Sequence, residues 1–228
     1  MKLSSDTLNV LKNFSTINPG IAFNAGNVLR TISAGKTVLA KATLKEEFPE
    51  DFCINDLPQF LSVYSLYKDT VDINFDDVNI ILTAGKIKTK YRKTAKEMIV
   101  TPPDKELSIS SVDVSFRLTE EVFSSILKSA SVLQSPNISF ESDGDKIYVK
   151  AFDAKDNSAH TNSIEVAEGN GKSFSFVFLP ENFKMIPGTY DVEISAKGLA
   201  SFSNSKVEID YFIAMEAKFS EFDGKKVA

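Results

Sequence analysis

Residues 4–23 read SSDTLNVLKNFSTINPGIAF, which predicts a capped amphipathic helix that ends at a proline and continues into a strand. Ser4 or Ser5 can cap this helix, because a short side-chain oxygen accepts hydrogen bonds from the free N–H groups of the first turn. The residue before Pro19 is disfavoured in the α conformation, so the helix should end near Asn18. The opposite, polar face carries Lys12 as its one charge. The apolar stripe at helical spacing consists of Leu8, Val10, Leu11, Phe14 and Ile17.

The same pattern occurs a second time, at residues 119–140, which read TEEVFSSILKSASVLQSPNISF. Thr119 is the expected cap, and Lys128 lies on the polar face with Ser124 and Ser125. The segment PNISF (136–140) repeats the segment PGIAF (19–23). We interpret the chain as one unit of about a hundred residues that is present twice, which places it in the α+β class.

The rest of each half reads mainly as alternating strands with tight turns. The first half contains a second expected helix, residues 56–67, and a three-strand meander, residues 71–91. In the second half, residues 180–184 are a one-turn remnant of that helix. Residues 45–50 are expected to be a charged loop. The predicted domains are residues 1–100 and 111–218, with a linker at 101–110 and a loose tail at 219–228.

Composition limits the function. The chain has 228 residues, 43% of them apolar, and a formal net charge of −5, which argues against a generally basic nucleic-acid coat. It has one cysteine and one histidine, so an intrachain disulfide and a zinc site are both excluded, and a reducing compartment is expected. We expect no membrane-spanning segment, because no apolar run approaches about 20 residues.

Signals of catalysis are weak. Residues 33–37 (SAGKT) resemble the end of a P-loop, but Arg30 occupies the position of the required first glycine, so a hairpin is the better interpretation. Cys53 and His160 could form a nucleophilic pair only if they met in the fold. A buried structural thiol and a surface histidine are the simpler interpretation. We therefore predict a protein that is not an enzyme and needs no metal or other cofactor.

Two charge features remain. The first is a basic strand that includes Lys86, Lys88, Lys90 and Arg92, whose alternation places these side chains on one face. Such a strand is either a solvated edge that lysine protects from aggregation, or a contact for an acidic partner strand or for phosphate. The second is a set of lysines on or at the ends of corresponding helices in the two halves: Lys12, Lys68, Lys128 and Lys184.

With these features, the chain resembles the sliding clamps, the ring-shaped processivity factors of DNA polymerases, and in particular the clamps of T-even-type tailed phages. The opening MKLSxDTxxxLKNFxTINxGI (1–21) carries the resemblance most specifically. NDLxxFLxxxSL (55–66), MxPGxY (185–190) and YFIAMEA (211–217) support it.

The resemblance implies two clamp domains per subunit, with antiparallel sheets outside and helices lining a ring. It implies a homotrimer that encircles duplex DNA without regard to sequence, tethers the DNA polymerase and is loaded by an ATP-dependent clamp loader. It also implies service to transcription and a place in the cytoplasm of an infected host cell, without membrane partners. The lysines Lys12, Lys68, Lys128 and Lys184 would face the DNA.

Two further sites are expected. The resemblance implies an apolar pocket for partner peptides, for which the candidates are Ile99, Val100, Ile213 and Met215. For the subunit interface we expect the basic strand to pair with an acidic strand of a neighbour, using Lys86, Lys88, Lys90, Glu165 and Glu168. The alternatives are a virion structural or carbohydrate-binding β-protein and, less favoured, an enzyme that uses Cys53 or His160.

Overall fold

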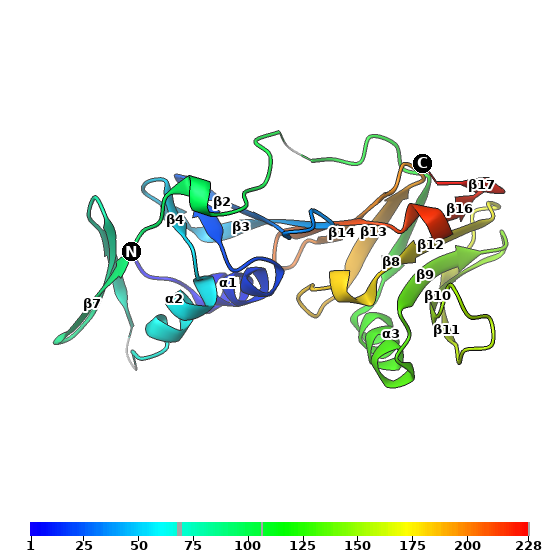
Figure 1. Cartoon of the computed structure of the whole chain (residues 1–228), viewed down its shortest axis with the longest axis horizontal. Coiled ribbons are helices and arrows are strands. Elements are labelled where there is room, and N and C mark those ends of the chain that lie inside the picture. Colours follow the sequence, from blue (N-terminus) through cyan, green and yellow to red (C-terminus); the bar gives the residue numbers. More distant parts are fainter. Residues whose placement is uncertain (68–69, 106, 228) are drawn as a thin grey trace. The chain divides into compact units, whose positions relative to one another are not determined.

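The computed structural model describes residues 1–67, 70–105 and 107–227, which fold into two compact units (Figure 1). Unit 1 consists of residues 1–105 together with 207–209. Unit 2 consists of residues 106–206 together with 210–228.

Unit 1 combines two α-helices, α1 (Ser5–Ile17) and α2 (Leu57–Tyr64), which contact each other, with antiparallel strands and the short 3-10 helix η1 (Lys96–Met98). β1 pairs with β4, and β2 pairs with β3. The predicted meander is confirmed as the sheet β5–β6–β7, in which β7 is an edge strand. The strands are β1 (Ile21–Phe23), β2 (Gly26–Ile32), β3 (Val38–Phe48), β4 (Phe52–Ile54), β5 (Asp72–Phe75), β6 (Asn79–Ala84) and β7 (Ile87–Arg92).

Unit 2 packs one long helix, α3 (Glu120–Leu133), against a six-stranded antiparallel sheet of order β11–β10–β9–β12–β16–β17. Its other strands follow the order β15–β14–β13–β8. The strands are β8 (Val114–Leu118), β9 (Asn137–Ser142), β10 (Lys146–Phe152), β11 (Asn162–Glu168), β12 (Phe174–Phe178), β13 (Tyr190–Ser195), β14 (Leu199–Asn204), β15 (Ile209–Ala214), β16 (Glu221–Phe222) and β17 (Lys225–Lys226). The 3-10 helices are η2 (Pro180–Asn182) and η3 (Ala217–Phe219).

The duplicated helices form as their sequences predict. Ser4 caps α1 by accepting the Thr7 N–H at 3.2 Å, and Thr119 caps α3 by accepting the Val122 N–H at 3.4 Å. In each helix the apolar stripe faces the core, with Phe14 in α1 and Phe123 in α3 buried. The polar faces, with their lysines, are therefore left at the surface of each unit.

A carboxylate from β3 also binds the first turn of α1. Glu46 accepts hydrogen bonds from the Ser4 N–H and from the Thr7 hydroxyl. Partial burial raises the pKa of Glu46, but these hydrogen bonds outweigh burial and leave the pKa below its ordinary value. The charged form is thus the form that stabilises the fold.

We expect the Glu46→Gln variant to lose about 1 kcal/mol of unfolding free energy at pH 7, because a charge-assisted hydrogen bond is lost. In the parent the folded pKa is lowered, so the contribution of Glu46 is present above the unfolded pKa of about 4.3 and disappears as the pH falls through the folded value. Denaturant titrations between pH 7 and 3 should therefore converge for the two proteins in acid. Glu47→Gln, at the exposed neighbouring position, is the control; a difference that persists in acid would contradict the assignment.

The MxPGxY segment has a structural role in unit 2. The Tyr190 hydroxyl donates to the Ile186 carbonyl, and the Ile186 N–H donates to the Tyr211 hydroxyl at 3.1 Å. Both tyrosine side chains are fully buried, and burial raises the pKa of each. A Cβ on Gly188 would lie 2.5 Å from the Asn204 amide nitrogen, so a larger residue there would have to displace the Asn204 side chain.

Two expectations about local structure were wrong. Residues 45–48 are not loop but the end of β3, because Leu44 and Phe48 alternate into the core and the Phe48 ring lies 4.7 Å from the Phe23 ring. The loose tail is instead a hairpin: β16 pairs with β12 and then with β17. The Phe222 ring stacks on Phe176 at 5.9 Å, and this apolar contact holds the hairpin to the sheet.

Candidate nucleic-acid and subunit interfaces

Among the described residues, the two lysines in α-helices lie on corresponding polar faces. Lys12 is exposed on the polar face of α1, and Lys128 is exposed on the polar face of α3. An exposed uncharged polar residue precedes each lysine by about one turn, Asn9 before Lys12 and Ser125 before Lys128. Each helix therefore places one lysine on its exposed face, which suits sequence-independent contact with phosphate oxygens.

The other two predicted DNA-facing lysines differ. Lys68 lies outside the described residues. Lys184 is exposed, but it does not lie in a helix as expected, because the 3-10 turn η2 ends at Asn182 and Phe183 turns into the core.

The basic strand is confirmed as the edge strand β7, but its lysines are not all alike. Lys88 and Lys90 are exposed on one face, whereas the alternate residues Thr89 and Tyr91 turn towards the core of unit 1. Lys86 precedes the strand, in the β6–β7 turn. As an edge strand, β7 offers unpaired backbone groups along its outer side.

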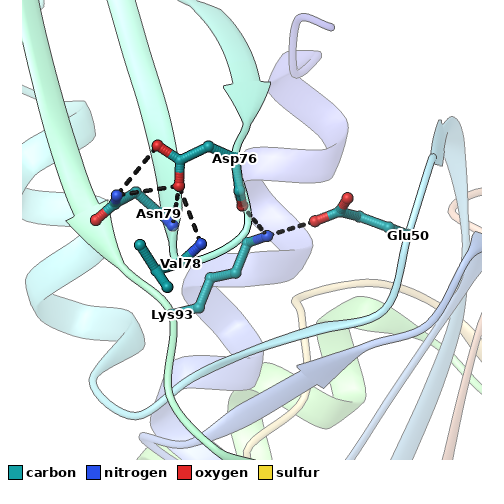
Figure 2. A network of polar contacts seen from close by, with 5 residues as sticks. All are labelled: Glu50, Asp76, Val78, Asn79 and Lys93. Atoms are coloured by element: carbon teal, nitrogen blue, oxygen red, sulfur yellow. Dashed lines mark hydrogen bonds and ion pairs between the residues drawn. The ribbon is translucent and has the colours of Figure 1, made fainter.

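Lys93, directly after β7, fixes the end of this strand to the rest of unit 1 (Figure 2). Its ammonium donates to Glu50 at 2.5 Å and to the Asp76 carbonyl at 2.6 Å, and its side chain is only 13% exposed. The Asp76 carboxylate accepts hydrogen bonds from Asn79 and from the Val78 N–H, which lower the pKa of Asp76. Lys93 is thus a structural lysine, in contrast to Lys88 and Lys90.

The acidic strand is also at an edge. β11 ends the six-stranded sheet, and Glu165 and Glu168 are both exposed. Residues three apart point to opposite faces of a regular strand, but the register shifts between Ile147 and Tyr148, and this bulge returns both glutamates to one face. Lys146 pairs with Glu165 at 2.5 Å and with Glu168 at 3.3 Å. Two carboxylates share one lysine, so this face keeps a negative excess.

The residues predicted for the peptide pocket are not equally available. Ile213 is 0% exposed and lies on the face of β15 that Tyr211 also occupies, so, contrary to the expectation, it offers no surface to a peptide. Met215 is buried too. Val100 is 42% exposed, and Ile99 packs on Gly20, where a Cβ would lie 2.7 Å from the Ile99 side chain.

Sequence reasoning missed the residues that hold the start of the linker in unit 1. The Asn18 amide donates to the carbonyls of Ile32 at 2.9 Å and Val100 at 3.0 Å. Arg30 donates to the Pro103 carbonyl at 2.6 Å and also reaches the next two carbonyls. A polar side chain beside a proline gave no local signal of this long-range role.

The alternative sites found in the sequence have ordinary structural surroundings. Cys53 is buried, which raises the pKa of its thiol, and His160 is exposed on a loop. Within the described ranges, no group of three or more His, Cys, Asp and Glu side chains is placed to hold a metal ion. Every helix in that part of the chain is too short or too polar to span a bilayer.

Comparison with known proteins agrees with this architecture. The family "DNA polymerase processivity factor" matches residues 4–101, and "gp45 sliding clamp, C terminal" matches residues 115–217. The sliding clamp of Escherichia phage RB69 is 31% identical over 224 residues, covering 95% of this chain and 97% of that protein. The sliding clamp of Vibrio phage KVP40 is 30% identical, covering 95% of this chain and all of that protein.

Solved structures share the fold at low sequence identity. The A. fulgidus PCNA bound to the C-terminal region of FEN-1 has a TM-score of 0.67 at 16% identity, over 92% of this chain and 94% of that one. The Helicobacter pylori beta clamp bound to a DNA ligase peptide has a TM-score of 0.70 at 12% identity, over 95% of this chain and 65% of that one. With its two family matches and its phage relatives, the chain belongs to the sliding clamps of T-even-type phages, which are DNA polymerase processivity factors.

Proposed function

We propose that three copies of this chain close head to tail into a ring around duplex DNA and tether the replicative polymerase to its template. The observation that carries the proposal is the pair of exposed lysines, Lys12 and Lys128, on equivalent helix faces of a chain whose net charge is −5. The lysines attract phosphate without reading sequence, while the acidic remainder repels DNA from the outer wall. Lys184, exposed but outside a helix, adds to this attraction, as does Lys68 by its sequence position.

Tethering of this kind needs no chemistry in the clamp. A closed ring cannot leave circular DNA without opening, so it holds the polymerase near the primer end at a high effective concentration. The domains predicted at 1–100 and 111–218, joined by the linker 101–110, supply the two repeats per subunit. An ATP-dependent loader opens the ring, and the clamp also serves transcription, all within the cytoplasm of the infected host.

Partner proteins are proposed to dock by short peptides, as FEN-1 and a DNA ligase do on the structural neighbours. Support comes from the exposed apolar side chain of Val100 and from Ile99, on a segment whose backbone Asn18 and Arg30 hold in place. A preformed segment binds a peptide with a smaller loss of conformational entropy than a free linker.

The function is tested by two measurements on the full chain. Sedimentation equilibrium should give a mass three times that of the 25.1 kDa chain. A polymerase assay on primed circular DNA should give longer products with clamp, loader and ATP than without any one of them. A monomer at all concentrations, or product lengths indifferent to the clamp, would refute the proposal.

For subunit contact, we propose that β7 of one protomer pairs with β11 of the next. Both are edge strands, and their exposed faces carry opposite charge: Lys88 and Lys90 on β7, and Glu165 and Glu168 on β11. Lys86, in the turn before β7, lies close enough in sequence to extend the basic face. Main-chain pairing supplies affinity, and the charges select the partner strand.

Replacing Lys88 and Lys90 by glutamate should raise the dissociation constant of the trimer about 100-fold or more, because like charges then face each other at every interface. Sedimentation velocity over a dilution series measures the shift towards monomer. The charge-matched control replaces Lys36 and Lys155, which are exposed in turns or loops. An unchanged dissociation constant would reject β7 as the interface strand.

A further inference from the structure

Two large apolar side chains lie at the surface beside the two edge strands. Leu66 is 72% exposed and Val132 is 73% exposed, the highest values among the exposed large apolar residues. A single exposed leucine or valine is normal on a protein surface, so exposure alone carries little weight. Their positions near the edge strands β7 and β11 are the stronger argument.

Leu66 is the sequence neighbour of a residue that contacts β7. It follows the end of α2 and precedes Tyr67, whose hydroxyl donates to the Thr89 side chain in β7 at 2.6 Å and to the Leu82 carbonyl at 3.1 Å. Near its start, α2 is also tied to β7, because the Phe60 and Tyr91 rings meet edge to face at 5.3 Å. Phe60 and Tyr67 thus contact the side of β7 that Thr89 and Tyr91 occupy, and the exposed Leu66 directly precedes Tyr67.

Val132 lies beside β11. It is in the last turn of α3, where Lys128, Ser129, Val132 and Leu133 line a cavity of 320 Å³ together with Thr161 and Asn162 at the start of β11. The cavity is open to solvent and is large enough to accept a leucine side chain. α3 therefore stands beside β11 much as α2 stands beside β7 in the other unit.

The charges decide which faces would match if these strands pair. Lys88 and Lys90 lie on the face of β7 opposite to Thr89 and Tyr91. Glu165 and Glu168 lie on the face of β11 opposite to Asn162, which lines the cavity with α3. Pairing that brings the lysines to the glutamates on one face must bring the helix sides together on the other, because a sheet has only two faces.

We propose that Leu66 of one protomer enters the cavity between α3 and β11 of the next, where it contacts Val132. The occupant is a second copy of this chain, and the inference rests on the head-to-tail ring proposed above. The contact is heterologous, since each protomer gives Leu66 at one end and the cavity at the other. It adds apolar burial to an interface whose strand contacts are polar and charged.

A cysteine pair tests the contact. In a Cys53→Ser background, Leu66→Cys combined with Val132→Cys should form intersubunit disulfides on mild oxidation, giving covalent dimers and trimers on a non-reducing gel. Neither single variant should cross-link, because Leu66 does not meet Leu66 in a heterologous contact. Cross-linking by Leu66→Cys alone, or none by the pair in a protein that sediments as a trimer, would overturn the contact while leaving the ring intact. A parent protein that sediments only as monomer would overturn the ring itself.

A second measurement tests the same contact through its apolar burial. Leu66→Ser and Val132→Ser should each raise the trimer dissociation constant about tenfold or more, because buried apolar area is lost. Val28→Ser, at an exposed position on β2, should leave it unchanged. Equal values for all three variants would contradict the proposed contact.

Discussion

Replacing both Lys12 and Lys128 by glutamine should lower the affinity of the ring for DNA by roughly two to three orders of magnitude at about 0.15 M salt. The proposed trimer carries each lysine three times, so this double variant removes six positive charges from the surface that we propose faces the duplex. Each phosphate contact contributes about 0.9 to the slope of log affinity against log salt, so the slope should fall by roughly 5. Glutamine keeps much of the side-chain length, so the helix faces remain otherwise similar.

The measurement is the affinity of the clamp for a linear duplex over a range of salt concentrations, because the ring can enter and leave free DNA ends without opening; product length from the polymerase is measured beside it. Sedimentation of the variant checks that the trimer persists. Lys36→Gln with Lys155→Gln is the matched control, because it removes the same charge from exposed turn and loop positions. If both double variants lose the same amount of affinity for DNA, the overall charge of the protein attracts the DNA, and the helix faces have no special part in it.

Among glycine-to-alanine substitutions in this chain, we expect Gly169→Ala to lower the unfolding free energy most. A Cβ at Gly169 would lie 2.1 Å from the Gly144 carbonyl oxygen and 2.6 Å from its carbon, and both atoms belong to the backbone. The Gly169 N–H donates to the Asp145 carbonyl at 2.7 Å, and the Gly171 N–H donates to Gly144 at 3.0 Å. Backbone atoms this close cannot rotate away as a side chain could, so the two turns must separate.

We expect this substitution to cost about 3 kcal/mol, which for a chain of this size lowers the midpoint of thermal unfolding by roughly 6–12 °C. It should also weaken the trimer, because the separated turns begin β10 at Lys146 and end β11 at Glu168. Gly35→Ala is the control: its Cβ would find no atom nearer than 3.9 Å. Calorimetry measures the midpoint of thermal unfolding of both variants. Equal midpoints would contradict the prediction and show that the two turns separate without strain.

The sequence located the helices well because their signals are local. A cap, a 3.6-residue apolar period and a following proline all lie within about twenty residues, and α1 and α3 begin directly after Ser4 and Thr119 as expected. The exposure of Lys12 and Lys128 followed from the same periodicity. The meander β5–β6–β7 was also recognisable, since its turns at Asp76 and Gly85 are close in sequence.

The errors fall where distant residues decide the structure. The C-terminal hairpin is held by the stacking of Phe222 on Phe176, and the linker by Arg30 donating to carbonyls more than seventy positions away. Neither contact leaves a periodic pattern at its own position. The resemblance implies Ile213 in the peptide pocket, whereas the alternation of β15 turns its side chain into the core.

By itself, the sequence determined three things: the duplicated helix-and-strand unit, the lysines on the solvent-facing sides of its helices, and the place of the chain in the sliding-clamp family. Each depends on local spacing or on matching residues. Only the tertiary structure decided that β7 and β11 are edge strands and that a bulge places Glu165 and Glu168 on one face. It alone placed Val132 at a cavity beside β11, and Leu66 at the surface next to Tyr67, which bonds to β7. Strand order and register depend on pairing between distant segments, and that information is spread over the whole chain.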